Sequence, residues 1–136
     1  MADIVLNAVY DAAQRSFRTQ GSGSERFESD FVDCARRAVS YINVNADPET
    51  RITLPTSTES TLTGLDAKYE YVLFSGITRF LMEAGQKPAK GFEKQLPHVV
   101  RQFESDVQGY QDDVRNIATE ADSDDEVDII GIGGLG

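Results

Sequence analysis

A run of apolar residues with a seven-residue period occupies the last third of the chain. From Leu96 to Ala121 the steps between its members alternate between four and three residues. This period places them on one face of a single helix, expected over about 92–121, with Pro97 either kinking that helix or starting it. The seam comprises Leu96, Val100, Phe103, Val107, Tyr110, Val114 and Ile117. A seam of almost 40 Å, at about 1.5 Å per residue, must pack against a partner helix, so an all-α bundle is expected.

A second strongly apolar helix is expected over 65–85. Apolar residues recur there at helical spacing and also extend around much of the circumference. Such a helix is buried on more than one side, either centrally in a bundle or at a subunit interface. Gly76, at its middle, costs roughly 1 kcal/mol of helix propensity and therefore predicts close packing against another helix. Gly85 is placed to supply the left-handed cap after the last turn.

Three aromatic residues of this helix predict a contact between subunits. Tyr69, Tyr71 and Phe74 point in different directions around the helix and cannot all face one core. Aromatic side chains often anchor interfaces. We therefore expect at least one of the three to become buried only when copies of the chain assemble.

Two further helices are expected near the N-terminus, over about 3–19 and about 23–44. The glycine-containing stretch "TQGSGSE" separates them, and Ser22 with Glu25 has the spacing of a capping box. Cys34 falls on or beside the apolar stripe of the second of these helices. The single histidine, His98, is far away in the sequence, so a packed core thiol is favoured over an activated nucleophile.

The segment 45–64 is expected to be an irregular loop. It contains two prolines and many serine and threonine residues, and "RITL" (51–54) is its one candidate for a short strand, ended by Pro55. No alternating partner strand is evident near it. Any sheet is therefore expected to be minor or to form between molecules.

The chain ends with an acidic linker followed by an apolar, glycine-rich string. Residues 122–136 read "DSDDEVDIIGIGGLG" and are expected to form a tail outside the helical domain of residues 1–121. Mutual repulsion of the acids favours an extended tether. The docking element beyond it is expected to use Ile129, Ile130, Ile132 and Leu135. The alternative is a frayed terminus without a role.

No catalytic, cofactor or metal site is predicted. One histidine, one cysteine and no tryptophan leave little material for catalysis, and no cluster has the spacing of metal ligands. "GIGGLG" neither follows a strand nor opens a helix, so a nucleotide loop is not favoured. The acids of 122–128 do not match the twelve-residue calcium loop.

The charge and hydropathy patterns limit the partners and the location. The formal net charge of -10 argues against recognition of specific nucleic-acid sequences, since phosphate contacts need clustered Lys and Arg. One cysteine excludes an intrachain disulfide and fits a reducing compartment. The N-terminus does not resemble a signal peptide, and no apolar run approaches the ~20 residues of a membrane span.

The order of elements, together with one short motif, resembles a known family. Within "ITLPTSTESTLTGLDAKYEYVLFSGITRFL" a leucine–proline loop precedes a helix carrying leucine–acid–x–x–tyrosine–x–x–x–leucine–x–x–glycine. Here these residues are Leu65, Asp66, Tyr69, Leu73 and Gly76. The pattern resembles the head–tail connector or adaptor proteins of tailed bacteriophages, and in element order the resemblance covers about residues 3–121.

The resemblance implies a structural role without catalysis. Proteins of that family form a ring, typically dodecameric, beneath the portal and join the capsid to tail or neck proteins. A C-terminal tail commonly packs on the portal, and packaged DNA passes through the ring lumen. The implied location is the neck of the virion, with assembly in the bacterial host cytoplasm. The alternative is a monomeric helical module, regulatory or chaperone-like, that docks a partner through its C-terminal tail.

Overall fold

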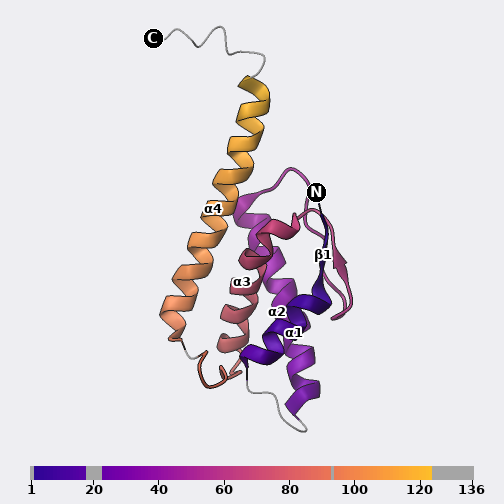
Figure 1. Cartoon of the computed structure of the whole chain (residues 1–136), viewed down its shortest axis with the longest axis vertical. Helices are drawn as coiled ribbons and strands as arrows, with labels where there is room; N and C mark the ends of the chain where they lie inside the picture. Colours follow the sequence, from indigo (N-terminus) through magenta and orange to yellow (C-terminus); the bar gives the residue numbers. More distant parts are fainter. Residues whose placement is uncertain (1, 18–22, 93, 124–136) are drawn as a thin grey trace.

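The computed structural model describes residues 2–17, 23–92 and 94–123, with side chains described in 2–17, 25–92 and 94–115. Four helices dominate it: α1 (Leu6–Ser16), α2 (Gly23–Ala46), α3 (Glu70–Glu83) and α4 (Leu96–Ser123). A short 3₁₀ helix, η1 (Ala67–Tyr69), leads into α3. The expected mostly helical bundle with a long C-terminal helix is confirmed (Figure 1).

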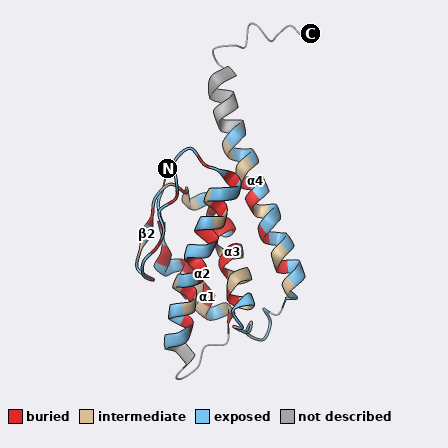
Figure 2. Cartoon of the chain, turned by 180° about the vertical axis from the view of Figure 1, so that it is seen from behind, coloured by how far each residue is buried: buried red, intermediate tan, exposed pale blue. Residues whose placement is uncertain are grey.

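Helix α3 lies at the centre of the bundle. It packs extensively against both α2 and α4, and α1 covers it from another side. Five of its residues are buried: Val72, Leu73, Gly76, Ile77 and Leu81. The sequence left open whether this helix is central or lies at a subunit interface, and the structure places it in the centre. Figure 2 shows the buried residues gathered where the helices face one another.

Gly76 is the point of closest approach between α3 and its neighbours. A Cβ built on it would lie 2.6 Å from the Phe103 ring of α4 and 2.9 Å from the Cβ of Ala38 in α2. Glycine therefore lets three helices meet at one level, as its position in the middle of the helix predicted. Phe103 is fully buried in this contact.

The expected apolar seam of α4 coincides with the buried core in its middle and is wrong at its start. Phe103, Val107 and Tyr110 are buried, while Leu96 and Val100 are only half-buried. Val99, which the seven-residue period omits, is 3% exposed. At the start of α4, Val99 therefore faces the core in place of Val100, and the seam is displaced by one residue there. Val114 is half-buried, and the side chain of Ile117 lies outside the described part.

Pro97 starts α4 and does not kink it. The helix begins at Leu96, and the carbonyl of Gln95 accepts hydrogen bonds from the N–H groups of His98 and Val99. Proline fits a first helical turn because its missing N–H would have no helical partner there. The expected helix over about 92–121 therefore begins four residues late.

The expected N-terminal helix is shorter than 3–19. Ile4–Val5 form strand β1, α1 occupies Leu6–Ser16, and Phe17 is extended. The second helix reaches Ala46, close to the expected end at 44. Ser22 of the expected capping box lies outside the described residues. The helix expected from 65 begins at Glu70, after η1. The side chain of Asp66 caps η1 by accepting a hydrogen bond from the N–H of Lys68.

The sheet is minor, as expected, but it forms within the chain and from other residues. β1 pairs antiparallel with β2 (Thr61–Leu62), in a register that sets buried Ile4 opposite buried Leu62. The expectation of a strand at "RITL" is wrong. Asn43 instead binds the backbone of Ile52 through both ends of its amide, with Nδ2 donating at 3.0 Å and Oδ1 accepting at 2.9 Å. The loop 45–64 is thereby fastened to α2.

Candidate functional site

Cys34 is a core residue of α2. Its side chain is 2% exposed, and burial raises the pKa of the thiol to about 12, with Arg37 opposing that shift. A thiol that stays protonated at neutral pH is a poor nucleophile. His98 lies on α4, exposed, and has no cysteine beside it. The structure therefore does not bring the two together, in keeping with the packed-thiol interpretation.

Among the described residues no group of three or more His, Cys, Asp or Glu side chains is arranged to hold a metal ion. No described helix is long and apolar enough to cross a bilayer.

The three aromatic residues expected at a subunit interface differ in burial. Tyr69 is 6% exposed; its ring packs edge-on against Tyr110 at 4.7 Å, and its hydroxyl donates to Asp113 at 3.4 Å. Tyr71 is 51% exposed, and Phe74 is half-buried. Tyr69 is thus satisfied within the chain. Tyr71 and Phe74 are the two that retain surface for a partner.

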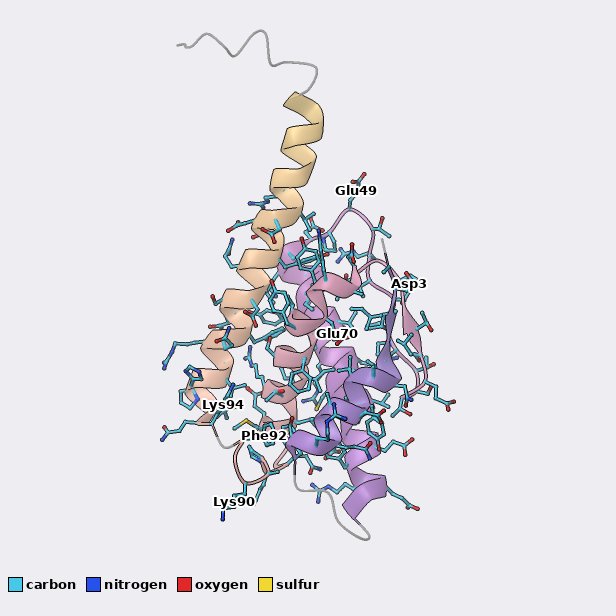
Figure 3. The ribbon with its side chains drawn as sticks, in the orientation of Figure 1. Asp3, Glu49, Glu70, Lys90, Phe92 and Lys94 are labelled. Carbon is cyan, nitrogen blue, oxygen red and sulfur yellow. The ribbon has the colours of Figure 1, made fainter. Side chains whose placement is uncertain are left out.

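An apolar pocket opens at the end of the bundle where α4 begins. It has a volume of about 120 Å³ and lies between the end of α1, one face of α3, the segment that joins α3 to α4, and the first turns of α4. Its apolar wall includes Phe17, Phe74, Met82, Phe92 and Val99, and its polar rim includes Lys94, His98 and Gln102. We call it the basic pocket, because Lys94 lines it, Lys90 lies at the same end of the molecule (Figure 3), and none of the described residues that line it is acidic.

Backbone hydrogen bonds hold the wall of this pocket in place. Phe17 and Pro88 form an isolated antiparallel bridge, and the N–H of Ala89 donates to the carbonyl of Ser16 at 2.8 Å. The N–H of Phe92 closes a turn onto Ala89 at 2.9 Å. Phe92 is nevertheless 53% exposed. In Figure 3 it lies between Lys90 and Lys94 at the end of the molecule opposite the labelled acids Asp3 and Glu49. The sequence alone does not reveal this pocket, because its walls come from four separate segments of the chain.

A shallower hollow, the α2 groove, lies on the outer face of α2. Its lining includes Arg37, Tyr41, Val44, Leu54 and Phe80. Val44 is 73% exposed and Leu54 is 45% exposed, so apolar surface is open to solvent here too. Asp33 and two arginines share the groove, which gives it a mixed charge.

Arg79 of α3 is a half-buried charged residue that the sequence did not single out. Its guanidinium lies 5.1 Å from the centre of the Phe80 ring and 5.6 Å from that of Tyr41. Its Nε donates to Glu83 at 3.2 Å, while its buried Nη1 has no hydrogen-bond partner among the described residues. The stacking joins α3 to α2 by cation–π attraction.

The predicted tail residues Ile129, Ile130, Ile132 and Leu135 lie outside the described residues. The last described residue, Ser123, stands at the end of α4, which rises beyond the other helices (Figure 1). No protein-family model, no curated protein and no solved structure matches this chain.

Proposed function

We propose that the chain is a non-enzymatic assembly protein, a head–tail connector that forms a ring beneath the portal of a tailed bacteriophage. The ring joins capsid to tail or neck proteins and leaves a lumen for packaged DNA. Its contacts are with copies of itself, with the portal protein and with the component below.

The observation that carries the proposal is the course of α4. Tyr110 of α4 meets Tyr69 in the core. Seven residues beyond Tyr110, at Ile117, the helix still continues, and it ends only at Ser123. The remaining 13 residues, counted from 124 to 136, therefore begin away from the chain's own core. Apolar side chains are costly to leave in water, which favours a partner for this segment.

The residues of the family-like motif support the proposal through their structural roles. Leu65 and Leu73 are fully buried, Asp66 caps η1, and Gly76 admits the Phe103 ring. Each motif position thus has a physical reason in the helix that forms the centre of the bundle. Because α3 lies at the centre, the outer faces of the helices around it remain available for contacts between subunits.

The decisive experiment is genetic. In the parent phage, a stop codon early in this gene should yield DNA-filled heads and separate tails, visible by negative-stain electron microscopy. Co-expression with the portal protein of the same genome should yield a complex with a second ring on the portal. Normal joined particles from the stop mutant would overturn the proposal.

The alternative is a monomeric regulatory or chaperone-like module. It is favoured by the closed core: the large buried side chains of the described residues, Tyr69 included, find their partners within one chain. The two functions differ in the mature particle. A connector stays in the virion in a fixed number of copies, whereas a chaperone is absent from it, so quantitative mass spectrometry of purified particles separates them.

A further inference from the structure

The segment 87–101, which supplies part of the wall of the basic pocket, carries a concentration of positive charge in an otherwise acidic chain. Residues 87–101 contain four basic side chains and a single acid, Glu93, while the whole chain has a net charge of -10. The basic residues are Lys87, Lys90, Lys94 and Arg101, and all four are exposed. Lys94 lines the pocket itself.

Two acids on neighbouring helices, Asp30 and Glu83, are paired with basic side chains of their own helices. Asp30 of α2 accepts a hydrogen bond from the side chain of Gln86 at 2.8 Å and lies 3.7 Å from Arg26. Glu83 of α3 accepts from Arg79. The surface around the pocket therefore attracts a negatively charged partner, and the pocket itself accepts an apolar group.

One segment of this chain has both properties in adjacent positions. Residues 124–128 contain four acids, and Ile129 and Ile130 follow directly. A cavity of about 150 Å³ lined by apolar residues can hold a benzene molecule, so one of about 120 Å³ has room for a branched aliphatic side chain. We propose that the basic pocket receives the segment 124–136 of a second copy of this chain.

Ile129 and Ile130 cannot reach the pocket of their own copy. From Gln102 at the pocket to Ser123 at its end, α4 spans about 32 Å at 1.5 Å per residue. Ile129 is six residues past Ser123, which spans at most about 21 Å when fully extended, and Ile130 gains only one residue more. The chain would also have to run back beside the acids of α4, Asp112 and Asp113. Docking of these isoleucines is therefore between molecules.

Such docking joins unlike ends of two copies. The end bearing Asp3, Glu49 and the exit of α4 meets the end bearing Lys90 and Lys94 (Figure 3). A contact between unlike surfaces repeats into a closed ring or an open filament. The inference rests on the proposed assembly function and deepens it by naming the partner of the tail.

Two full-length variants test the docking by complementation. Ile129→Ser/Ile130→Ser removes the apolar residues of the tail, and Lys90→Glu/Lys94→Glu reverses the charge at the pocket. In sedimentation equilibrium each variant alone should associate at least tenfold more weakly than the parent protein. A 1:1 mixture should form a heterodimer and grow no further, because only one intact tail and one intact pocket remain to meet.

Control experiments identify the binding site and the segment that occupies it. Arg37→Glu/Lys68→Glu makes the same change in charge away from the pocket, with Arg37 in the α2 groove, and should leave association unchanged. A synthetic 124–136 peptide should compete, whereas the same peptide with serine at 129 and 130 should not. Cysteines introduced by Ile130→Cys and Gln102→Cys should form a disulfide between copies.

Three results would overturn the inference: a parent protein that stays monomeric at millimolar concentration, a variant mixture without heterodimer, or a control variant that weakens association equally. The assay contains only this protein. A tail that binds the portal but not a second copy would therefore refute this inference and leave the proposed function standing, whereas particles that join without this protein would refute the function alone.

Discussion

At the scale of single residues, two glycines on neighbouring helices have opposite roles. Gly76→Ala should lower the free energy of unfolding by about 1–3 kcal/mol, because the new methyl group would collide with Phe103 and Ala38, both fully buried. Gly109 of α4 has no atom within 4 Å of the same construction. Gly109→Ala should therefore raise stability by up to about 1 kcal/mol through helix propensity alone.

Urea unfolding of the two glycine variants checks this prediction. The substitutions are chemically identical and both lie within helices, so the sign of the difference isolates the close approach at Gly76. Equal gains in both variants would show that the Phe103 ring moves aside at little cost.

The thiol of Cys34 predicts a loss of stability at high pH. An unfolded thiol ionises near pH 9, whereas burial holds the folded pKa at about 12. The unfolded state therefore loses its proton first as the pH rises. The stabilisation is complete below about pH 8.5 and is lost between about pH 9 and about 12, at up to about 1.4 kcal/mol per pH unit.

Unfolding measured between pH 8 and 10.5 checks the role of the thiol. Burial also raises the pKa of Tyr69 and Tyr110, so some alkaline loss remains in any variant. Cys34→Ala should be less stable at pH 8 and yet show a shallower decline. A decline of unchanged steepness would mean that the tyrosines account for all of it.

At the scale of elements, the effect of a substitution in α4 on stability depends on which face of the helix carries it. Val107→Asp should unfold the protein, since an unpaired carboxylate at a position 4% exposed costs several kcal/mol against a total stability of about 5–15 kcal/mol. Phe103→Asp should do the same. Ser105→Asp adds the same charge at an exposed position of the same helix and should change the melting temperature little.

Circular dichroism melting separates these variants. Cooperative unfolding near the parental temperature in both Val107→Asp and Phe103→Asp would place the seam on the wrong face of α4. The Ser105→Asp control shows whether added negative charge alone destabilises a protein that is already acidic.

The helices could be predicted from the sequence where their positions follow from the local periodicity of apolar residues. The 3.6-residue repeat located α2 well, and the role of Gly76 followed from its cost in a helix. The prediction for the first turn of α4 was wrong, because a strict seven-residue period drifts against a straight helix. Val99 therefore faces the core in place of Val100.

The sheet and the pocket were not predictable for a different reason. β1 and β2 have two residues each and are stabilised by partners more than 50 positions apart in the chain, such as Leu6 donating to the carbonyl of Ser60. "RITL" has the composition of a strand, but the side chain of Asn43 bonds both backbone groups of its Ile52. The basic pocket likewise exists only after α1, α3 and α4 have met.

At the scale of the whole molecule, the aromatic residues of α3 separate folding from assembly. Tyr69→Ala should destabilise the single chain by about 3–5 kcal/mol, because the buried ring contacts Tyr110. Tyr71→Ala should change the melting temperature little, since that side chain is 51% exposed. If Tyr71 lies between subunits, its variant should form fewer rings on the portal, as counted by electron microscopy. Full ring formation would remove Tyr71 from the interface.

The last prediction concerns the segment beyond α4. Deletion of 126–136 should leave helicity and melting temperature unchanged, because the large apolar side chains of the described core pack against one another. Four apolar side chains, each worth about 1.5–3 kcal/mol when fully buried, are lost to the partner, although ordering the glycines offsets part of that gain. The truncated protein should therefore fold and yet fail to join heads to tails in a complementation assay. Normal infectious particles would show that the segment has no role in assembly, and a failure to fold would show that it belongs to the core.

The 126–136 deletion keeps the acids up to Asp125. A shorter deletion of 133–136 serves as its matched control. It should retain most of the activity if Ile129 and Ile130 are the residues that dock.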